Sequence, residues 1–289
     1  MKRALSALVL AAAAAGCAQG ARPASSPAPA ASQAPADPAP FPSTYTPFPS
    51  RPTLIRGATV MTATGQVIPN GQLLMADGRI VGVGATVEAP AGVTVVDATG
   101  KYVTPGIIDT HSHLGAYASP GVDAAEDGNE ATDPVTADVW VEHSVWPQDP
   151  GFARALAGGI TSLQILPGSA NLVGGRSVTL KNVPARTVQA MKFPGAPYGL
   201  KMACGENPKR VYASRGPSTR MGNVAGYRAA WIRAQDYRKK WDDWERQGRP
   251  AGSRPTRDLE LETLAEVLRG NILVQNHCYR ADEMAQMID

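Results

Sequence analysis

The sequence predicts an α/β fold in which a parallel sheet follows a small all-β segment. Residues 54–97 have the pattern of short strands separated by turn residues, which is typical of a small β-sandwich piece. After Val103, apolar runs alternate with stretches of helical periodicity. That alternation implies a parallel sheet covered by helices.

The all-β segment is divided by turn signals. Asp77-Gly78, between two apolar runs, predicts a tight hairpin, and Pro69-Asn70-Gly71 predicts a further turn. The strands expected from these boundaries cover residues 54–61, 72–76, 79–83 and 94–97.

The second part of the chain predicts strands and helices in alternation. The strands are expected over residues 160–166, 176–181, 199–203 and 271–275. The helices are expected over residues 152–158, 223–246 and 261–268, and residues 281–289 read as the start of another helix.

The N-terminus has the pattern of a bacterial export signal. Lys2 and Arg3 precede an apolar run over residues 4–15, which is too short to span a bilayer. The Ala-Gly-Cys sequence ending at Cys17 resembles a lipobox, so residues 1–17 predict a lipoprotein-type signal peptide. The alternative is an ordinary signal peptide with an incidental cysteine. We therefore expect a protein of the bacterial cell envelope, either an outer-membrane lipoprotein or a periplasmic protein, that meets the membrane only through a lipid anchor.

Composition bears on the segment after the signal peptide, on a nucleic-acid partner and on disulfide bonds. Residues 18–52 are rich in Pro, Ala and Ser and nearly uncharged, which predicts a disordered tether. The net charge of +3 is too small and scattered to indicate a nucleic-acid partner. Cys204 and Cys278 leave room for a single disulfide, but we favour the reading of Cys278 as a small buried residue.

The most specific motif lies in residues 103–114, VTPGIIDTHSHL. Side chains alternate along a strand, so His111 and His113 share a face. Two imidazoles at the carboxyl end of a strand form half of a divalent metal site. The motif therefore suggests a metal-dependent enzyme.

The motifs together resemble the amidohydrolase superfamily, in the branch of imidazolonepropionase-like and prolidase-like enzymes. The resemblance covers nearly the whole chain from Thr53 onward. Its stretches are LIRGATVMTATG, GQLLMADGRIVGVG, VVDATGKYVTPGIIDTHSHLG, AGGITSLQILPGSANLVGGRSVTLKN, GLKMACGENPKR and ILVQNHCYRADEM.

The resemblance implies a TIM-like (β/α)8 barrel, with residues 103–289 as its N-terminal part and residues 53–102 as part of a small composite β-sandwich. It implies that His111 and His113 end the first barrel strand and that His277 ends the fifth. Lys201 then falls in the fourth strand, where many members have a carboxylated lysine between two metals. One or two divalent ions, Zn²⁺ first, are the cofactor that this ligand set implies.

Other side chains near these motifs have open roles. Glu206 is an alternative ligand in place of Lys201, and Asp109 is either an orienting partner of a histidine or a buried capping group. Arg210, Arg215 and Arg220 either bind a substrate carboxylate or form a solvated basic loop, and we favour the second.

The function expected from the resemblance is hydrolysis of a carbon–nitrogen bond in a small amide, cyclic amide or dipeptide by metal-activated water. Only about five of the eight barrel strands can be placed by resemblance, and the aspartate that would serve as general base is expected beyond residue 289. We therefore expect a fragment of a longer enzyme. The alternative is a truncated, catalytically inactive, lipid-tethered scaffold or binding protein. The sequence does not predict the oligomeric state.

Overall fold

A computed structural model describes residues 41–288 of the chain. The predicted signal peptide over residues 1–17, with its Cys17, and most of the predicted tether lie outside these residues. In the described part of the chain, no helix is both long and apolar enough to cross a membrane.

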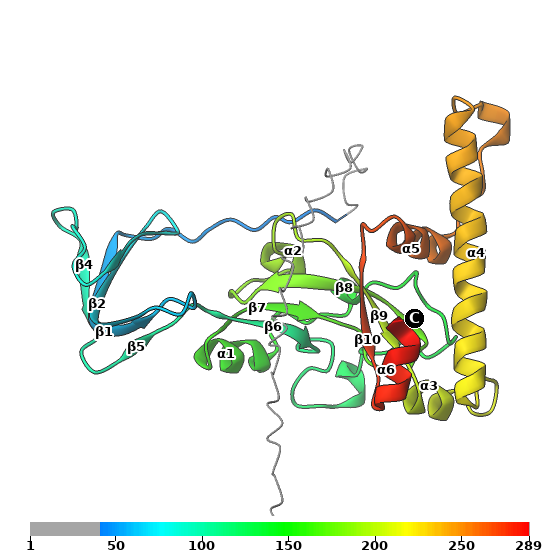
Figure 1. The fold of residues 1–289 in the computed structure, drawn as a ribbon, viewed down its shortest axis with the longest axis horizontal. Coiled ribbons are helices and arrows are strands. Elements are labelled where there is room, and N and C mark those ends of the chain that lie inside the picture. Colours follow the sequence, from blue (N-terminus) through cyan, green and yellow to red (C-terminus); the bar gives the residue numbers. More distant parts are fainter. Residues whose placement is uncertain (1–40, 289) are drawn as a thin grey trace, which may run out of the picture. The chain divides into compact units, whose positions relative to one another are not determined.

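The first sheet has five strands, and Figure 1 labels β1, β2, β4 and β5 of it. β2 lies between β1 and β3 and is antiparallel to both, whereas β4 and β5 run parallel to β1. Ala58, Val60, Ile68 and Ala98 form its small core. The strands are β1 (Thr53–Met61), β2 (Val67–Ala76), β3 (Arg79–Gly84), β4 (Thr94–Asp97) and β5 (Tyr102–Val103).

The structure bears out one of the two turn predictions in this sheet. Asp77 and Gly78 both have positive φ and connect β2 to β3, as the hairpin prediction requires. The predicted turn at residues 69–71 is wrong, because these residues lie inside β2. Pro69 and Asn70 form a bulge opposite β1, and Asn70 adopts a φ of 49° there.

The second sheet is curved and has the strand order β10-β9-β8-β7-β6 (Figure 1). β6 runs parallel to β7 and β9 parallel to β10, but β8 is antiparallel to both of its neighbours. The prediction of a wholly parallel sheet is therefore wrong at β8. A short loop over residues 166–172 connects β7 to β8, and a parallel connection would need a longer crossover. The strands are β6 (Ile107–Ser112), β7 (Ile160–Ile165), β8 (Val173–Lys181), β9 (Gly199–Ala203) and β10 (Leu273–His277).

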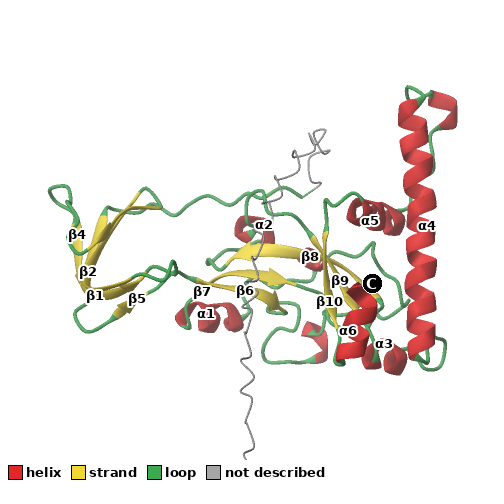
Figure 2. Cartoon of the chain, viewed as in Figure 1, coloured by secondary structure: helices red, strands yellow, loops and turns green. Residues whose placement is uncertain are grey.

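Helices lie between the other consecutive strands of this second sheet, but β7 and β8 are joined by a loop without a helix (Figure 2). Leu200 and Met202 of β9 pack in one apolar core with Tyr227 of α4 and Leu264 of α5. The α-helices are α1 (Pro150–Ala157), α2 (Val188–Met191), α3 (Glu206–Val211), α4 (Arg220–Arg246), α5 (Leu259–Leu268) and α6 (Ala281–Ile288), and the short 3-10 helices are η1 (Asp123–Ala125), η2 (Val141–His143) and η3 (Ala251–Ser253).

The strand expected over residues 271–275 is found two residues later, as β10. It is not buried as expected, because Leu273 and Val274 are 55% and 45% exposed. Among residues 41–288, β10 pairs with β9 alone, so it is an edge strand there.

Residues 41–44, which belong to the predicted tether, are hydrogen-bonded to residues in and next to α2. The Nζ of Lys192 donates to the carbonyl of Phe41 at 2.7 Å, and the Ser43 hydroxyl donates to the carbonyl of Lys192 at 2.6 Å. The amide of Thr44 donates to Gln189. The segment over residues 41–44 is therefore hydrogen-bonded to the segment around α2.

Candidate metal centre

β9 explains how a lysine comes to lie inside the curved sheet. All five of its residues are buried. Alternation along the strand turns Leu200 and Met202 toward the helices, and Gly199, Lys201 and Ala203 toward the opposite face. The Nζ of Lys201 lies 3.4 Å from the Nε2 of His111, which comes from β6. The structure therefore brings together two of the predicted site residues from strands 90 residues apart in sequence.

Lys201 has an unusual environment for a lysine. Its side chain is completely buried, and its Nζ donates to the carbonyl of Pro167 at 3.0 Å. Within residues 41–288 it has no ion pair with a carboxylate. Burial lowers its pKa from 10.5 to about 8, because the charged form is desolvated.

The two histidines of the HSH motif lie side by side, with ring centroids 5.3 Å apart. The Nδ1 of His113 lies 2.8 Å from the carbonyl of Leu166, which accepts a hydrogen bond only if Nδ1 bears the proton. That tautomer leaves the Nε2 lone pair of His113 free for a metal. Burial and the positive charge of Lys201 lower the pKa of His111, and burial lowers that of His113. Both shifts favour the neutral imidazole, which is the form that binds metals.

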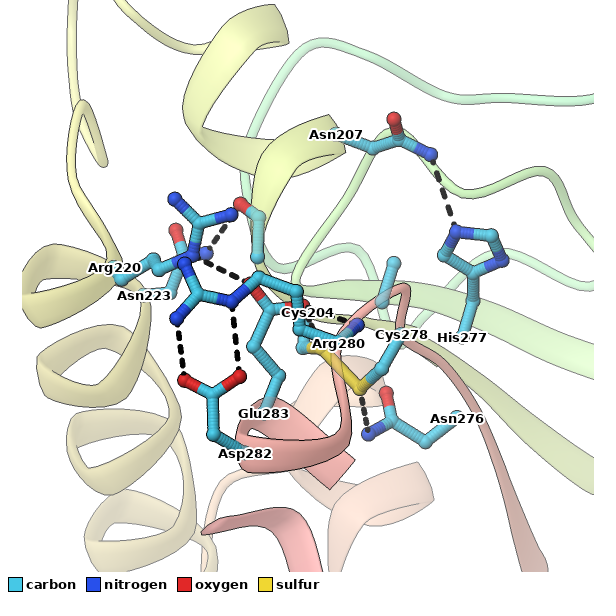
Figure 3. The surroundings of a disulfide bond; sticks show 12 residues. Cys204, Asn207, Arg220, Asn223, Asn276, His277, Cys278, Arg280, Asp282 and Glu283 are labelled. Atoms are coloured by element: carbon cyan, nitrogen blue, oxygen red, sulfur yellow. Dashed lines mark hydrogen bonds and ion pairs between the residues drawn. A yellow bond between two sulfur atoms is a disulfide. The ribbon is translucent and has the colours of Figure 1, made fainter. Parts of the chain in front are cut away.

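His277 lies at the end of β10, and Figure 3 shows its ring with Asn207 on one side. Its Nε2 is 3.5 Å from the Nδ2 of Asn207, and its ring packs edge-on against Tyr279 with centroids 4.5 Å apart. Burial lowers the pKa of His277, and the positive charge of Lys201 lowers it further. The charge of Lys201 therefore acts on all three histidines.

A ring of polar side chains lies next to Lys201 on the inner face of the sheet. Gln164 donates to Ser177, Ser177 donates to Gln275, and Gln275 donates back to Gln164, all between 3.1 and 3.2 Å. Gly199 leaves room for this ring, because a Cβ there would lie 2.1 Å from the Gln275 oxygen. Since each member both donates and accepts, the ring stays satisfied away from water.

Asp109 is the only acidic residue of the HSH motif, and it lies near its histidines. Its Oδ1 accepts the backbone N–H of His111 at 3.1 Å, and its negative charge raises the pKa of His111 and His113, although burial outweighs this. The contact is with backbone and not with an imidazole nitrogen. The structure thus gives Asp109 a local capping bond and leaves its orienting role a prediction.

Among residues 41–288 the other candidate residues make no hydrogen bond with the histidines, although Arg210 donates to Asn207, which contacts His277. Glu206 is exposed at the start of α3 and makes no hydrogen bond with them in the described part of the chain. Arg215 donates to the carbonyls of Thr132 and Ala131, and Arg220 pairs with the buried Glu283. These two arginines are therefore held by protein groups.

The donor chemistry of these residues fits a divalent cation such as Zn²⁺. Three imidazoles are held toward their neutral form, and a buried amine with a lowered pKa lies beside them. His111, His113 and His277 do not form a metal-ligand group on their own, since no three His, Cys, Asp or Glu side chains within residues 41–288 are placed to hold a metal. A carboxylated Lys201 would add an anionic oxygen ligand to these imidazoles.

Several residues around the site were not predicted. Asn207, Tyr279 and the ring formed by Gln164, Ser177 and Gln275 lack a distinctive motif. The alternation of β8 and β10 could have placed Ser177 and Gln275 on the inner face. The preference for Cys278 as a free buried residue was wrong, since Cys204 and Cys278 form a disulfide (Figure 3).

Comparison with known proteins decides the family. Amidohydrolase tasK from Hapsidospora irregularis is 35% identical over an alignment of 274 residues, and the match covers 83% of this chain and 28% of that protein. The crystal structure of an amidohydrolase from Thermotoga maritima MSB8 is 39% identical with a TM-score of 0.75, covering 82% of this chain and 60% of that one. The chain belongs to the amidohydrolase superfamily.

More distant relatives of this amidohydrolase chain match shorter segments. A dihydroorotase from Citrifermentans bemidjiense is 31% identical over 125 residues, which are 43% of this chain and 24% of that enzyme. The chain spans less than two thirds of the length of each of these relatives. No family model matches the sequence.

Proposed function

We propose that this chain contains the metal-binding half of a hydrolase site for carbon–nitrogen bonds. The site consists of His111 and His113 at the carboxyl end of β6, Lys201 in the middle of β9, and His277 at the carboxyl end of β10. Family membership supports the reaction class, and the small amides, cyclic amides and dipeptides expected from the sequence are the proposed substrates.

The observation that supports this proposal most is the environment of Lys201. A fully buried ammonium without a carboxylate partner is costly, so a structural role for this lysine would destabilise the fold. Its pKa of about 8 leaves a substantial fraction of the amine neutral near pH 8. A neutral amine can attack carbon dioxide, forming an N–C bond and releasing one proton, and the resulting carbamate is an anionic oxygen ligand. Carboxylation therefore removes the unpaired cation and adds the ligand that the histidines lack.

Each residue of the proposed site has a distinct role. His111 and the carboxylated Lys201 would be ligands of a divalent cation, and His113 would present its Nε2 while the Leu166 carbonyl fixes its ring. His277 would complete the set from β10. A divalent cation held there would lower the pKa of a water molecule and polarise the substrate carbonyl. The Gln164–Ser177–Gln275 ring holds three neighbouring strands together beside these ligands.

The proposal is tested by hydrolysis and by isotope labelling. A zinc-loaded protein that contains this chain together with the general base implied by the resemblance should release amine or free carboxylate from at least one member of a panel of cyclic amides, N-acyl amino acids and dipeptides. His111→Gln should abolish this release, while His143→Gln should not, because His143 lies outside the site against Phe41 and Trp140. Carbon-13 bicarbonate should give a carbamate signal that disappears in Lys201→Met. Absence of hydrolysis with a panel of this breadth would favour the scaffold alternative.

We also propose, from the sequence of residues 1–17, that the protein is exported and lipid-anchored at Cys17. The disulfide between Cys204 and Cys278 is of a kind that persists in oxidising compartments such as the periplasm. Mass spectrometry of the mature N-terminus tests this, because an acylated Cys17 as first residue supports it and an intact Met1 contradicts it.

A further inference from the structure

The disulfide between Cys204 and Cys278 joins the two strands that bring Lys201 and His277 to the site (Figure 3). Cys204 directly follows β9, and Cys278 directly follows His277 at the end of β10. The Cα atoms are 5.1 Å apart, and the Cys204 amide also donates to the carbonyl of His277 at 2.7 Å. The end of β10 is therefore held to β9 by one covalent bond and one hydrogen bond.

This link matters because β10 is otherwise weakly held in the described part of the chain. Its only strand neighbour is β9, and Leu273 and Val274 are largely exposed. The register pairs Ala203 with His277 and Lys201 with Gln275. Fraying of the end of β10 would move His277 away from Lys201 while leaving β6 in place.

The far side of the disulfide is anchored to the rest of the protein. Glu283 of α6 is buried, pairs with Arg220 of α4 and accepts the backbone N–H of Arg280 at 3.2 Å. Its carboxylate also lies against Gly205, next to Cys204, where a Cβ would come within 2.4 Å of it. Glu283 thus holds the turn that follows Cys278, and the disulfide holds Cys278 itself to Cys204. His277 directly precedes Cys278, so its backbone position depends on the disulfide.

We propose that Cys204–Cys278 is a redox-sensitive positioning link for His277, so that a dithiol reductant loosens the proposed metal centre. Cys204 is buried and Cys278 is partly exposed, so the reductant reaches the bond from the Cys278 side. This inference rests on the proposed function for its consequence, but the movement of His277 can be observed without any metal.

The chemical step is ordinary thiol–disulfide exchange. One thiolate of the reductant attacks the Sγ of Cys278 and expels the Cys204 thiolate. The second thiolate of the reductant then attacks the reductant's own sulfur in the mixed disulfide and expels the Cys278 thiolate. The two cysteines gain two electrons and two protons, and the dithiol leaves as a cyclic disulfide.

The experiment uses the imidazole resonances of metal-free protein, since the chain has only four histidines. Each resonance is assigned with one His→Gln variant, and spectra are recorded before and after reduction with dithiothreitol. We expect reduction to shift or broaden the His277 signals, while those of His113 and the distant His143 stay unchanged. Cys204→Ser/Cys278→Ser should reproduce the reduced spectrum, and Cys17→Ser, the matched control, should behave like the wild type. Unchanged His277 signals would overturn the proposal, as would equal changes at all four histidines.

A second measurement connects the link to the cation. Zinc should bind Cys204→Ser/Cys278→Ser about tenfold or more weakly than the oxidised wild type, a loss typical of removing a group that orients a ligand. In a His277→Gln background the same double substitution should cause no further loss. An equal loss in both backgrounds would show that the disulfide acts on the whole scaffold and would overturn the proposal. If zinc leaves the His111 and His113 signals unchanged, the proposed function fails, whereas the response of His277 to reduction still decides the positioning role.

Discussion

Two buried lysines of this protein lie in opposite environments. Lys192 pairs with Glu142 at 2.7 Å, donates to the carbonyl of Phe41 and contacts the hydroxyl of Tyr198. Lys201 is more deeply buried and meets only the carbonyl of Pro167 and the imidazole of His111. Both side chains are removed from water, but only Lys192 has its charge balanced.

The difference separates a structural cation from a chemical one. In the Lys192–Glu142 pair both buried charges are compensated by each other and by further hydrogen bonds. These bonds hold residues 41–43 to the segment around α2. A buried amine without an acid partner is costly when charged, so it is expected where a modification or a metal removes the cost. Exposure and residue type alone would not have distinguished the two lysines.

Breaking the Lys192 pair should have the largest effect on stability. Glu142→Ala leaves an uncompensated buried ammonium, so we expect the free energy of unfolding to fall by about 3–5 kcal/mol. Urea denaturation measures this loss. Asp243→Asn is the control, because it breaks an exposed pair with Lys239 and should leave the urea midpoint nearly unchanged. A small effect of Glu142→Ala would mean that the pair is not a structural anchor.

Lys201 should make the free energy of unfolding depend on pH. In cation-free, bicarbonate-free buffer, its pKa is lowered from 10.5 to about 8 on folding, so between these pH values the unfolded state binds more protons. The free energy of unfolding should therefore rise by about 3 kcal/mol as pH increases through this range. Lys201→Met should lack this rise, whereas the exposed Lys239→Met should retain it. Parallel profiles for Lys201→Met and wild type would contradict the lowered pKa.

The polar ring beside Lys201 should matter less. Ser177→Ala removes the member that connects Gln164 to Gln275, and leaves their polar groups short of partners. We expect a loss of about 1–3 kcal/mol in the free energy of unfolding, measured by urea denaturation. No loss would indicate that water replaces the hydroxyl.

The smallest expected effect on stability comes from Tyr198, which contacts the Lys192–Glu142 pair. Tyr198→Phe removes a hydroxyl that donates to Glu142 at 3.0 Å, but the Lys192–Glu142 pair remains. We expect a loss of about 1 kcal/mol in thermal or urea unfolding. A loss as large as that of Glu142→Ala would instead assign the anchoring role to Tyr198.

Local signals predicted much of the fold. The bounds of β4 and β9 agree with the expected ranges, because short apolar runs there are flanked by turn or polar residues. The reversal of β8 was missed, since strand direction depends on the length and path of the connection and not on the strand's own residues. The bulge at Asn70 was taken for a turn because Asn70 precedes a glycine and has the left-handed backbone that an Asn-Gly turn also uses.

The site was predictable only where a motif marks it. His111 and His113 could be predicted because side chains alternate along a strand and the two histidines therefore share a face. Lys201 and His277 were placed through family resemblance. The disulfide, Asn207 and the Gln164–Ser177–Gln275 ring depend on which strands become neighbours, and single-strand patterns contain no such information. Tertiary pairing therefore supplies the surroundings of the ligands, although the ligands themselves can be found in the sequence.

Zinc titration of the oxidised protein in bicarbonate buffer tests the central claim most directly. We predict that calorimetry detects binding by the wild type, and that His111→Gln and Lys201→Met each weaken it by about tenfold or more. His143→Gln should bind zinc like the wild type, because His143 lies against Phe41 and Trp140 outside the site. Equal zinc affinity in all four proteins, or no binding by the wild type, would contradict a metal centre built on Lys201 and the HSH motif.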